Sequence, residues 1–165
     1  NKTMTIDTKK TVKDLTTAPI ISIESSETLV QAGKVMKEKE VSMLVVMEKD
    51  QVVGLLTSGD WFKSFYLHVG DHLPETKYHT NKAGQFELQK QKMEIAKKRA
   101  AEFKQMKVSE IMNRHFTTID ENASLIEAIH QMKTRDIRRL LVADKTGKII
   151  GVLGRTKTIN TLLEE

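Results

Sequence analysis

The sequence has no cysteine, only two prolines and few aromatic residues, which make up 5% of its 165 residues. The absence of cysteine excludes a disulfide framework, a thiolate nucleophile and a cysteine-rich zinc site. The apolar runs are only a few residues long, which is too short for a membrane-spanning helix. The N-terminal segment NKTMTIDTKK lacks the apolar core of a signal peptide. We therefore expect an intracellular, cytoplasmic protein with no membrane contact.

Catalytic motifs are also lacking. The sequence has no P-loop, no metalloprotease motif and no Ser-His-Asp order. His68 and His72 have the spacing of metal ligands on a helix, with His79 nearby, but Gly70 interrupts that turn and no further ligand is fixed in place. We expect neither an enzyme nor a metal site.

An internal repeat is the main feature that the sequence does contain. Shifting the chain by 96 residues aligns residues 11–49 with residues 107–145, and most of the identities are apolar, as a shared core requires. A further one-residue shift aligns residues 51–60 with residues 148–157. The identical pairs are Val12/Val108, Ile23/Ile119, Leu29/Leu125, Ala32/Ala128, Met36/Met132, Lys37/Lys133, Leu44/Leu140, Val46/Val142 and Lys49/Lys145.

Both repeats predict the same elements. A short β run precedes a helix that opens with a capping box, Thr28-x-x-Gln31 or Ser124-x-x-Glu127. Two β runs with a hairpin-length connection follow, and a last helix begins near Asp60 or Arg155. One such unit buries too little surface to be stable alone. We expect an α/β fold of two pseudo-symmetric β-α-β-β-α repeats packed sheet to sheet, with repeats at 10–69 and 107–163 and a linker and basic helix at 70–106.

The repeats resemble a tandem pair of cystathionine-β-synthase (CBS) domains, also called a Bateman module. The resemblance rests on the duplicated element order, on the helix patterns TLVQAGKVM and SLIEAIHQM, and on Gly54-Leu55-Leu56-Thr57-Ser58-Gly59-Asp60. That heptapeptide matches the family signature G-h-h-[ST]-x-x-D, where h is apolar. The resemblance covers both repeats but not the insert between them.

The resemblance implies a regulatory module, with no required cofactor, that binds AMP, ADP, ATP or S-adenosylmethionine in a cleft between paired repeats. Asp60 would accept hydrogen bonds from the ribose hydroxyls, and Thr57 would donate to a sugar or phosphate oxygen. Gly54 would let the strand bend or let another backbone segment come close. Arginine guanidinium groups suit phosphate oxygens because their donors are planar and forked. The implied ligand-binding set is Leu55, Thr57, Asp60, Met112, His115, Thr117, Ile137, Arg138 and Arg139.

The second copy of the signature is broken. Gly154 stands where a hydroxyl residue is expected, and Lys157 stands where Asp is expected. Lysine has no acceptor for ribose hydroxyls, although Arg155 and Lys157 can bind phosphate. We therefore expect one competent nucleotide site, centred on Asp60. Asp60 also fits a plain helix cap, which is the commonest role for Asp before a helix.

The sequence of the insert between the repeats (70–106) predicts one long basic helix over 83–106. Residues 82–107 hold eight basic and three acidic residues. An apolar seam predicts a packing face along one side, formed by Phe86, Met93, Ala96, Ala100 and Phe103. The basic face fits a solvated surface, a docking surface for an acidic partner, or a nucleic-acid contact.

Two functions follow. The first is a nucleotide-sensing module that signals to a regulated protein. It would do so by changing the geometry of its repeats or of a homodimer. The homodimer would pair through apolar helical residues Phe65, Val69, Ile159 and Leu162. The alternative is a basic interaction protein with a vestigial cleft, whose insert helix binds nucleic acid or an acidic partner.

Overall fold

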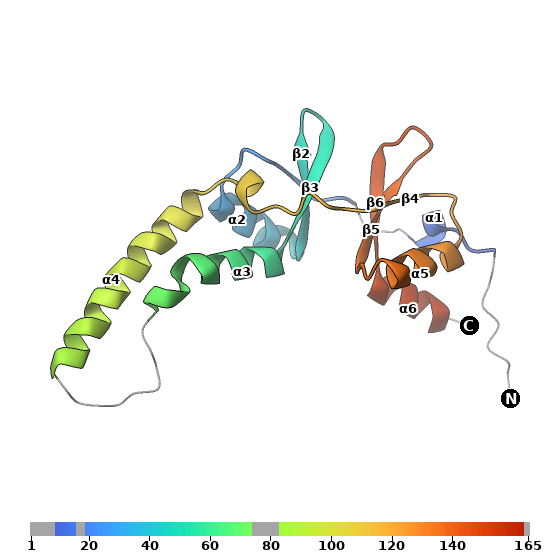
Figure 1. Ribbon diagram of the computed structural model, residues 1–165. Helices are drawn as coiled ribbons and strands as arrows, with labels where there is room; N and C mark the ends of the chain where they lie inside the picture. Colours follow the sequence, from blue (N-terminus) through green and yellow to red (C-terminus); the bar gives the residue numbers. More distant parts are fainter. Residues whose placement is uncertain (1–8, 16–18, 74–82, 164–165) are drawn as a thin grey trace, which may run out of the picture. The chain divides into compact units, whose positions relative to one another are not determined.

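The computed structural model describes residues 9–15, 19–73 and 83–163. The chain divides into two compact units, which we call the first-repeat unit (21–114) and the second-repeat unit (1–20 with 115–165). Each unit contains a three-stranded sheet with its helices, and a long helix lies between the repeats in sequence (Figure 1). The predicted α/β class and the duplicated β-α-β-β-α order are confirmed.

In the first-repeat unit the strand order is β1-β2-β3, with β1 parallel to β2 and β2 antiparallel to β3. Its elements are β1 (Ser22–Glu24), α2 (Leu29–Lys39), β2 (Met43–Glu48), β3 (Gln51–Thr57), α3 (Ser58–Val69), the 3-10 turn η1 (Gly70–His72), α4 (Ala83–Gln105) and the 3-10 turn η2 (Val108–Glu110). The β2–β3 turn places Lys49 and Asp50 at positive φ, as a two-residue type I′ hairpin requires.

The second-repeat unit repeats this sheet as β4-β5-β6, again with one parallel and one antiparallel pair. Its elements are α1 (Val12–Leu15), β4 (Thr118–Asp120), α5 (Leu125–Thr134), β5 (Arg139–Ala143), β6 (Ile149–Gly154) and α6 (Arg155–Leu163). Among the described residues, no helix has both the length and the apolarity to cross a membrane.

Hydroxyl caps start the first helix of each repeat. Thr28 Oγ1 accepts a hydrogen bond from the backbone N–H of Gln31 at 3.3 Å, and Ser124 Oγ accepts from Glu127 at 3.1 Å. Each bond satisfies an N–H group that has no partner within the helix. The return bond of the predicted capping box is absent from these two described helix starts, so only half of each box forms.

The segment leading into each repeat packs on the other repeat. The N–H of Val12 donates to the carbonyl of Ala123 at 2.8 Å, and the N–H of Val108 donates to the carbonyl of Glu27 at 2.8 Å. Residues 12 and 108 are equivalent, as are 27 and 123, so the exchange is reciprocal. The boundaries of the compact units therefore differ from those of the sequence repeats at 10–69 and 107–163, because each leading segment belongs to the other unit. Sequence alignment locates a repeat along the chain, but it does not show where the leading segment packs.

The long helix α4 packs against α2 and α3 and runs beside α3 in Figure 1. Phe103 is fully buried and makes edge-on contacts with Trp61 and Phe65, at centroid distances of 5.0 and 5.3 Å. Ala96 is also buried, which confirms this part of the predicted seam. Met93 is 40% exposed, so its assignment to the seam was wrong. The side chain of Phe86 lies outside the described residues.

Two residues expected on a homodimer surface instead belong to the interior. Val69 is buried, and Phe65 is half-buried with its ring stacked on Trp61 at 5.6 Å. The most exposed apolar side chains on α3 are Phe62, Tyr66 and Leu67. A helix turns through 100° per residue, so a shift of one position moves a side chain from the surface to the interior.

Candidate functional site

The junction between β3 and α3 holds the signature residues. Thr57 is the N-cap of α3, and its Oγ1 accepts a hydrogen bond from the N–H of Asp60 at 3.1 Å. Asp60 Oδ2 accepts from the N–H of Thr57 at 3.0 Å. The two bonds form a complete capping box, which locks both side chains at the start of the helix.

Capping uses only part of the Asp60 carboxylate. Its Oδ1 accepts no hydrogen bond from any described residue, and the side chain is half-buried at the helix N-terminus. The N-terminal end of a helix carries partial positive charge and favours anionic groups. Asp60 therefore presents one fixed acceptor oxygen beside backbone N–H groups, which suits a ligand that brings hydroxyls and phosphate.

Gly54 lies where a second backbone segment touches β3. A Cβ atom at this position would lie 2.8 Å from the carbonyl oxygen of Asn113 and 3.0 Å from Met112 Sδ. The main chains of Leu55 and Asn113 exchange two hydrogen bonds, at 2.9 and 2.8 Å. The sheet is also irregular next to the Val46–Gly54 pair. The predicted close backbone approach at Gly54 is confirmed.

This contact brings several predicted residues together in the first-repeat unit. Leu55 pairs directly with Asn113, and the residue before it, Met112, is buried against Gly54. Thr57 and Asp60 follow at the end of the same strand. Asn113 was not predicted from the sequence, although the glycine of the signature had already indicated that some backbone segment must lie there.

The remaining predicted residues belong to the second-repeat unit. The carbonyl of Thr117 accepts from the N–H of Leu141 at 2.9 Å, which holds the entry to β4 against β5. His115 and Arg138 are exposed, whereas Ile137 and Arg139 are half-buried. No described residue pairs with the guanidinium of Arg138, so its donors remain available to an anion.

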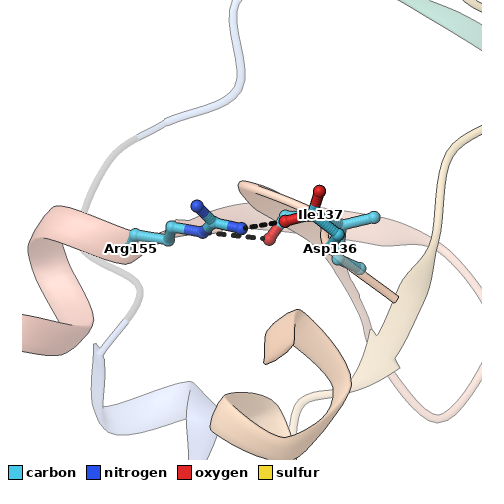
Figure 2. Close-up of polar contacts among 3 residues, drawn as sticks. All are labelled: Asp136, Ile137 and Arg155. Carbon is cyan, nitrogen blue, oxygen red and sulfur yellow. Dashed lines mark hydrogen bonds and ion pairs between the residues drawn. The ribbon is translucent and has the colours of Figure 1, made fainter. Parts of the chain in front are cut away.

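The broken signature in the second repeat has a different local structure. Arg155 donates from its guanidinium to Asp136 Oδ1 at 3.2 Å and to the carbonyl of Ile137 at 3.3 Å (Figure 2). These bonds tie the start of α6 to the turn after α5. Arg155 is thus already engaged by protein groups, while Lys157 is half-buried in the first turn of α6.

His68, the first residue of the histidine pair, lies beside an acidic and an aromatic side chain of α4. His68 Nε2 faces Glu102 Oε2 at 3.8 Å, and its ring lies 6.0 Å from that of Phe103. No group of three or more histidine or carboxylate side chains among the described residues is arranged to hold an ion. His79 lies outside the described residues.

Comparison with known proteins identifies the family. The CBS domain model matches residues 12–66 and 108–164, which is most of the chain. The chain therefore belongs to the CBS domain family, as the sequence resemblance predicted.

Solved structures share this fold. A conserved protein from Pyrococcus horikoshii is 22% identical with a TM-score of 0.67, covering 97% of this chain and 97% of that one. The protein CBSX2, solved in complex with AMP, is 21% identical with a TM-score of 0.62, covering 93% and 96%. At this identity the likeness shows the fold alone.

One curated relative is much longer than this chain. The homoserine O-acetyltransferase of Methanohalobium evestigatum is 26% identical over 155 residues, or 93% of this chain. The chain spans only about a quarter of that relative, 24% of its length.

Proposed function

We propose that this CBS pair binds one adenosyl ligand, AMP, ADP, ATP or S-adenosylmethionine, and thereby regulates an attached or associated cytoplasmic protein. The observation that carries the proposal is the β3–α3 junction. There the capping box fixes Asp60 while leaving its Oδ1 without a hydrogen bond from any described residue. Two adjacent ribose hydroxyls are natural donors for such an oxygen. The AMP complex of a protein with the same fold supports this ligand class.

The facing wall of the proposed cleft would come from the other repeat. We assign base contacts to Met112, His115, Thr117 and Ile137, and phosphate contacts to Arg138 and Arg139. Leu55 contributes apolar surface at the strand end. The second cleft, built on Gly154 and Lys157, lacks the ribose acceptor. We therefore propose a single competent site, so that the two repeats respond unequally to one ligand.

The signal would be a change in the arrangement of the repeats or of a homodimer. A ligand shifts such an equilibrium only by its difference in affinity for the two arrangements. A ligand that binds groups from both repeats meets this condition, because moving one repeat breaks half of its contacts. The homodimer would form through exposed apolar positions on the last helix of each repeat.

The test is thermal unfolding with AMP, ADP, ATP, S-adenosylmethionine and no ligand. A ligand present at 100 times its Kd stabilises the protein by about 2.7 kcal/mol, which raises the midpoint by several degrees. Asp60→Ala should abolish this shift. Asp60→Asn keeps an acceptor oxygen for the helix cap but loses the charge, so it should retain the unliganded midpoint and still lose affinity.

Lys157 is the matched control, because it occupies the Asp60 position in the second repeat. Lys157→Ala should leave the ligand-induced shift unchanged. Equal nucleotide affinity in wild type and Asp60→Ala would contradict the assignment of Asp60.

The alternative function depends on α4, whose exposed lysines include Lys90, Lys97 and Lys104. Neutralising Lys97, Lys98 and Arg99 should leave nucleotide affinity nearly unchanged if the nucleotide proposal is right. The interaction protein would be favoured by two results together. The wild type would bind nucleic acid or an acidic protein in a salt-dependent way that this variant loses, and it would bind none of the adenosyl ligands.

A further inference from the structure

A groove of about 320 Å³ lies between α5 and α6 in the second-repeat unit. A volume of this size is at the lower end of the range for small-molecule pockets. Both apolar and charged side chains line the groove. They include Ile129, Met132, Leu162, Lys133, Asp136 and Arg155. The apolar lining with a few charged groups is typical of a site that holds an apolar ligand in one orientation.

The groove has one charged end and one apolar end. Arg155, the first residue of α6, bonds to Asp136 just after α5, so the start of α6 lies beside the end of α5 (Figure 2). Lys133, in the last turn of α5, belongs to this charged end. Ile129 lies about one turn earlier on α5, and Leu162 lies about two turns further along α6. The groove therefore runs from charged to apolar side chains.

The charged end carries one positive charge in excess. Arg155 and Asp136 pair at 3.2 Å, so their charges offset each other. The ammonium group of Lys133 is exposed and pairs with no described residue. The Arg155 guanidinium is also held by the carbonyl of Ile137 at 3.3 Å. Two of its five N–H donors are thus used, and the others stay fixed in direction at the groove.

The same place is filled with protein in the first repeat. Trp61 and Phe65 occupy the positions that Thr158 and Leu162 occupy in the second repeat. The two rings stack at a centroid distance of 5.6 Å, and Phe103 of α4 covers them edge-on. Replacing two aromatic rings by smaller side chains leaves space between the helices. The described part of the second-repeat unit has no counterpart of α4 to cover that space.

Size and charge together specify the occupant. A water molecule takes about 30 Å³ in the liquid and a methylene group is of similar size, so the groove has room for about ten such groups. A neutral apolar molecule would leave the excess charge of Lys133 without a partner. A dianion such as phosphate would exceed that single charge and would not fill the apolar end. A straight-chain carboxylate of about eight to ten carbons fits both ends.

We propose that the α5–α6 groove binds a medium-chain fatty acid, with its carboxylate at Lys133 and Arg155 and its alkyl chain between Ile129 and Leu162. These residues are not among those assigned to the nucleotide, so the site is independent of Asp60. The second repeat, which lacks the ribose acceptor, would then respond to a different class of ligand from the first repeat.

Calorimetry with hexanoate, octanoate, decanoate and dodecanoate, each below its micelle concentration, tests the chain. Every two-carbon step up to decanoate should tighten binding roughly tenfold, because each buried methylene adds apolar surface. Dodecanoate should gain little more, because the groove is then full. Methyl NMR locates the ligand. Decanoate should shift the methyl signals of Ile129 and Leu162, whereas those of Leu44 and Leu56 in the first-repeat core should stay in place.

Two variants separate the head of the ligand from its tail. Lys133→Ala should weaken decanoate about fivefold and leave decanol, which has no charge, unchanged. Lys37→Ala is the matched control, because Lys37 is exposed at the same position of the first repeat, and it should bind both as wild type does. Thr158→Trp fills the groove as Trp61 does and should abolish both. If it fails to fold, Ile159→Glu replaces it, since Ile159 is an exposed lining residue.

Four results would overturn the proposal. The first is no decanoate binding by wild type at any protein concentration. The second is equal affinity in Lys133→Ala and a continued rise to dodecanoate, which indicates unspecific partition. The third is decanoate binding that disappears as wild type self-associates in sedimentation, which would assign the groove to a second copy. The fourth is binding to phosphatidylglycerol vesicles but not to free acid, which would assign it to a membrane surface.

Asp60→Ala keeps this test separate from the nucleotide proposal. The variant should bind decanoate as wild type does, because Asp60 belongs to the first-repeat unit and the groove to the second. Failure of wild type to respond to any adenosyl ligand would refute the nucleotide proposal and leave the decanoate result intact. Loss of decanoate binding in Asp60→Ala would contradict the independence of the two sites.

Discussion

At the scale of single residues, Asp60 combines a structural and a proposed functional role. One oxygen caps α3, and the other accepts no hydrogen bond from the described residues. The same capping box that stabilises the helix therefore fixes the direction of the remaining oxygen. A binding group held by the fold loses little conformational freedom when the ligand arrives, and this favours affinity.

Thr57→Ala tests the structural half of this arrangement. It removes the acceptor for the N–H of Asp60, which is bonded at 3.1 Å. Loss of an N-cap hydroxyl costs about 1 kcal/mol of unfolding free energy. Urea titration should show this loss without ligand, and calorimetry should show a separate loss of nucleotide affinity. A variant that binds nucleotide as wild type does would restrict Thr57 to capping.

Gly54 allows a sharper prediction about backbone contact. Gly54→Ala places a Cβ 2.8 Å from the Asn113 carbonyl, so β3 or the 112–113 segment must shift. We expect a loss of about 1–3 kcal/mol by urea titration, as for other overpacked sites. Gly154→Ala is the control, because a Cβ there meets nothing within 4 Å. Equal effects of the two substitutions would contradict the contact.

The sequence predicted the close backbone approach at Gly54 and the helix cap at Asp60, but not all of the residues that contact them. A signature motif shows which residue types a turn needs. It cannot show that Asn113, more than fifty positions later, lies beside Gly54 and bonds to Leu55, because that contact depends on the fold. Arg155 is the converse case, since its bond to Asp136 was not visible from the charge pattern.

At the scale of elements, α4 is an integral part of the first-repeat unit. Its sequence predicted the helix, and the helix forms over Ala83–Gln105. The side that packs was predicted only in part, because the seam includes half-buried polar residues such as Gln89 and Lys92. Apolar periodicity alone cannot find such positions, since the stems of long polar side chains also cover apolar surface.

Phe103→Ala measures how firmly α4 is held. The ring is fully buried between Trp61 and Phe65, so its removal leaves a cavity and should cost about 3–5 kcal/mol. Met93→Ala, on the same helix but 40% exposed, should change stability by less than about 0.5 kcal/mol. Urea unfolding of both variants checks this. A similar small effect in both would mean that α4 does not pack on α3 in solution.

At the scale of the whole molecule, the two repeats are joined by exchange of their leading segments. The sequence predicted the duplication because equivalent core positions recur after 96 residues. It did not predict the exchange, because Val12 and Val108 show the same pattern whichever unit they enter. The exchange means that neither repeat is complete when cut at its sequence boundary. Isolated repeats 10–69 and 107–163 would each carry a leading segment that belongs to the other unit.

Val12→Ala and Val108→Ala form a matched pair that tests this exchange. Both side chains are fully buried, so each substitution should cost about 2 kcal/mol. Each substitution should loosen the unit into which its leading segment packs, and not the repeat to which the residue belongs in sequence. Val12→Ala should speed amide hydrogen exchange in α5 and β4, because Val12 packs with Leu125 and Ile119. Val108→Ala should speed exchange in α2, because Val108 packs with Leu29. Mass spectrometry of peptides from both units distinguishes the patterns, and protection lost within each residue's own repeat would show that the segments are not exchanged.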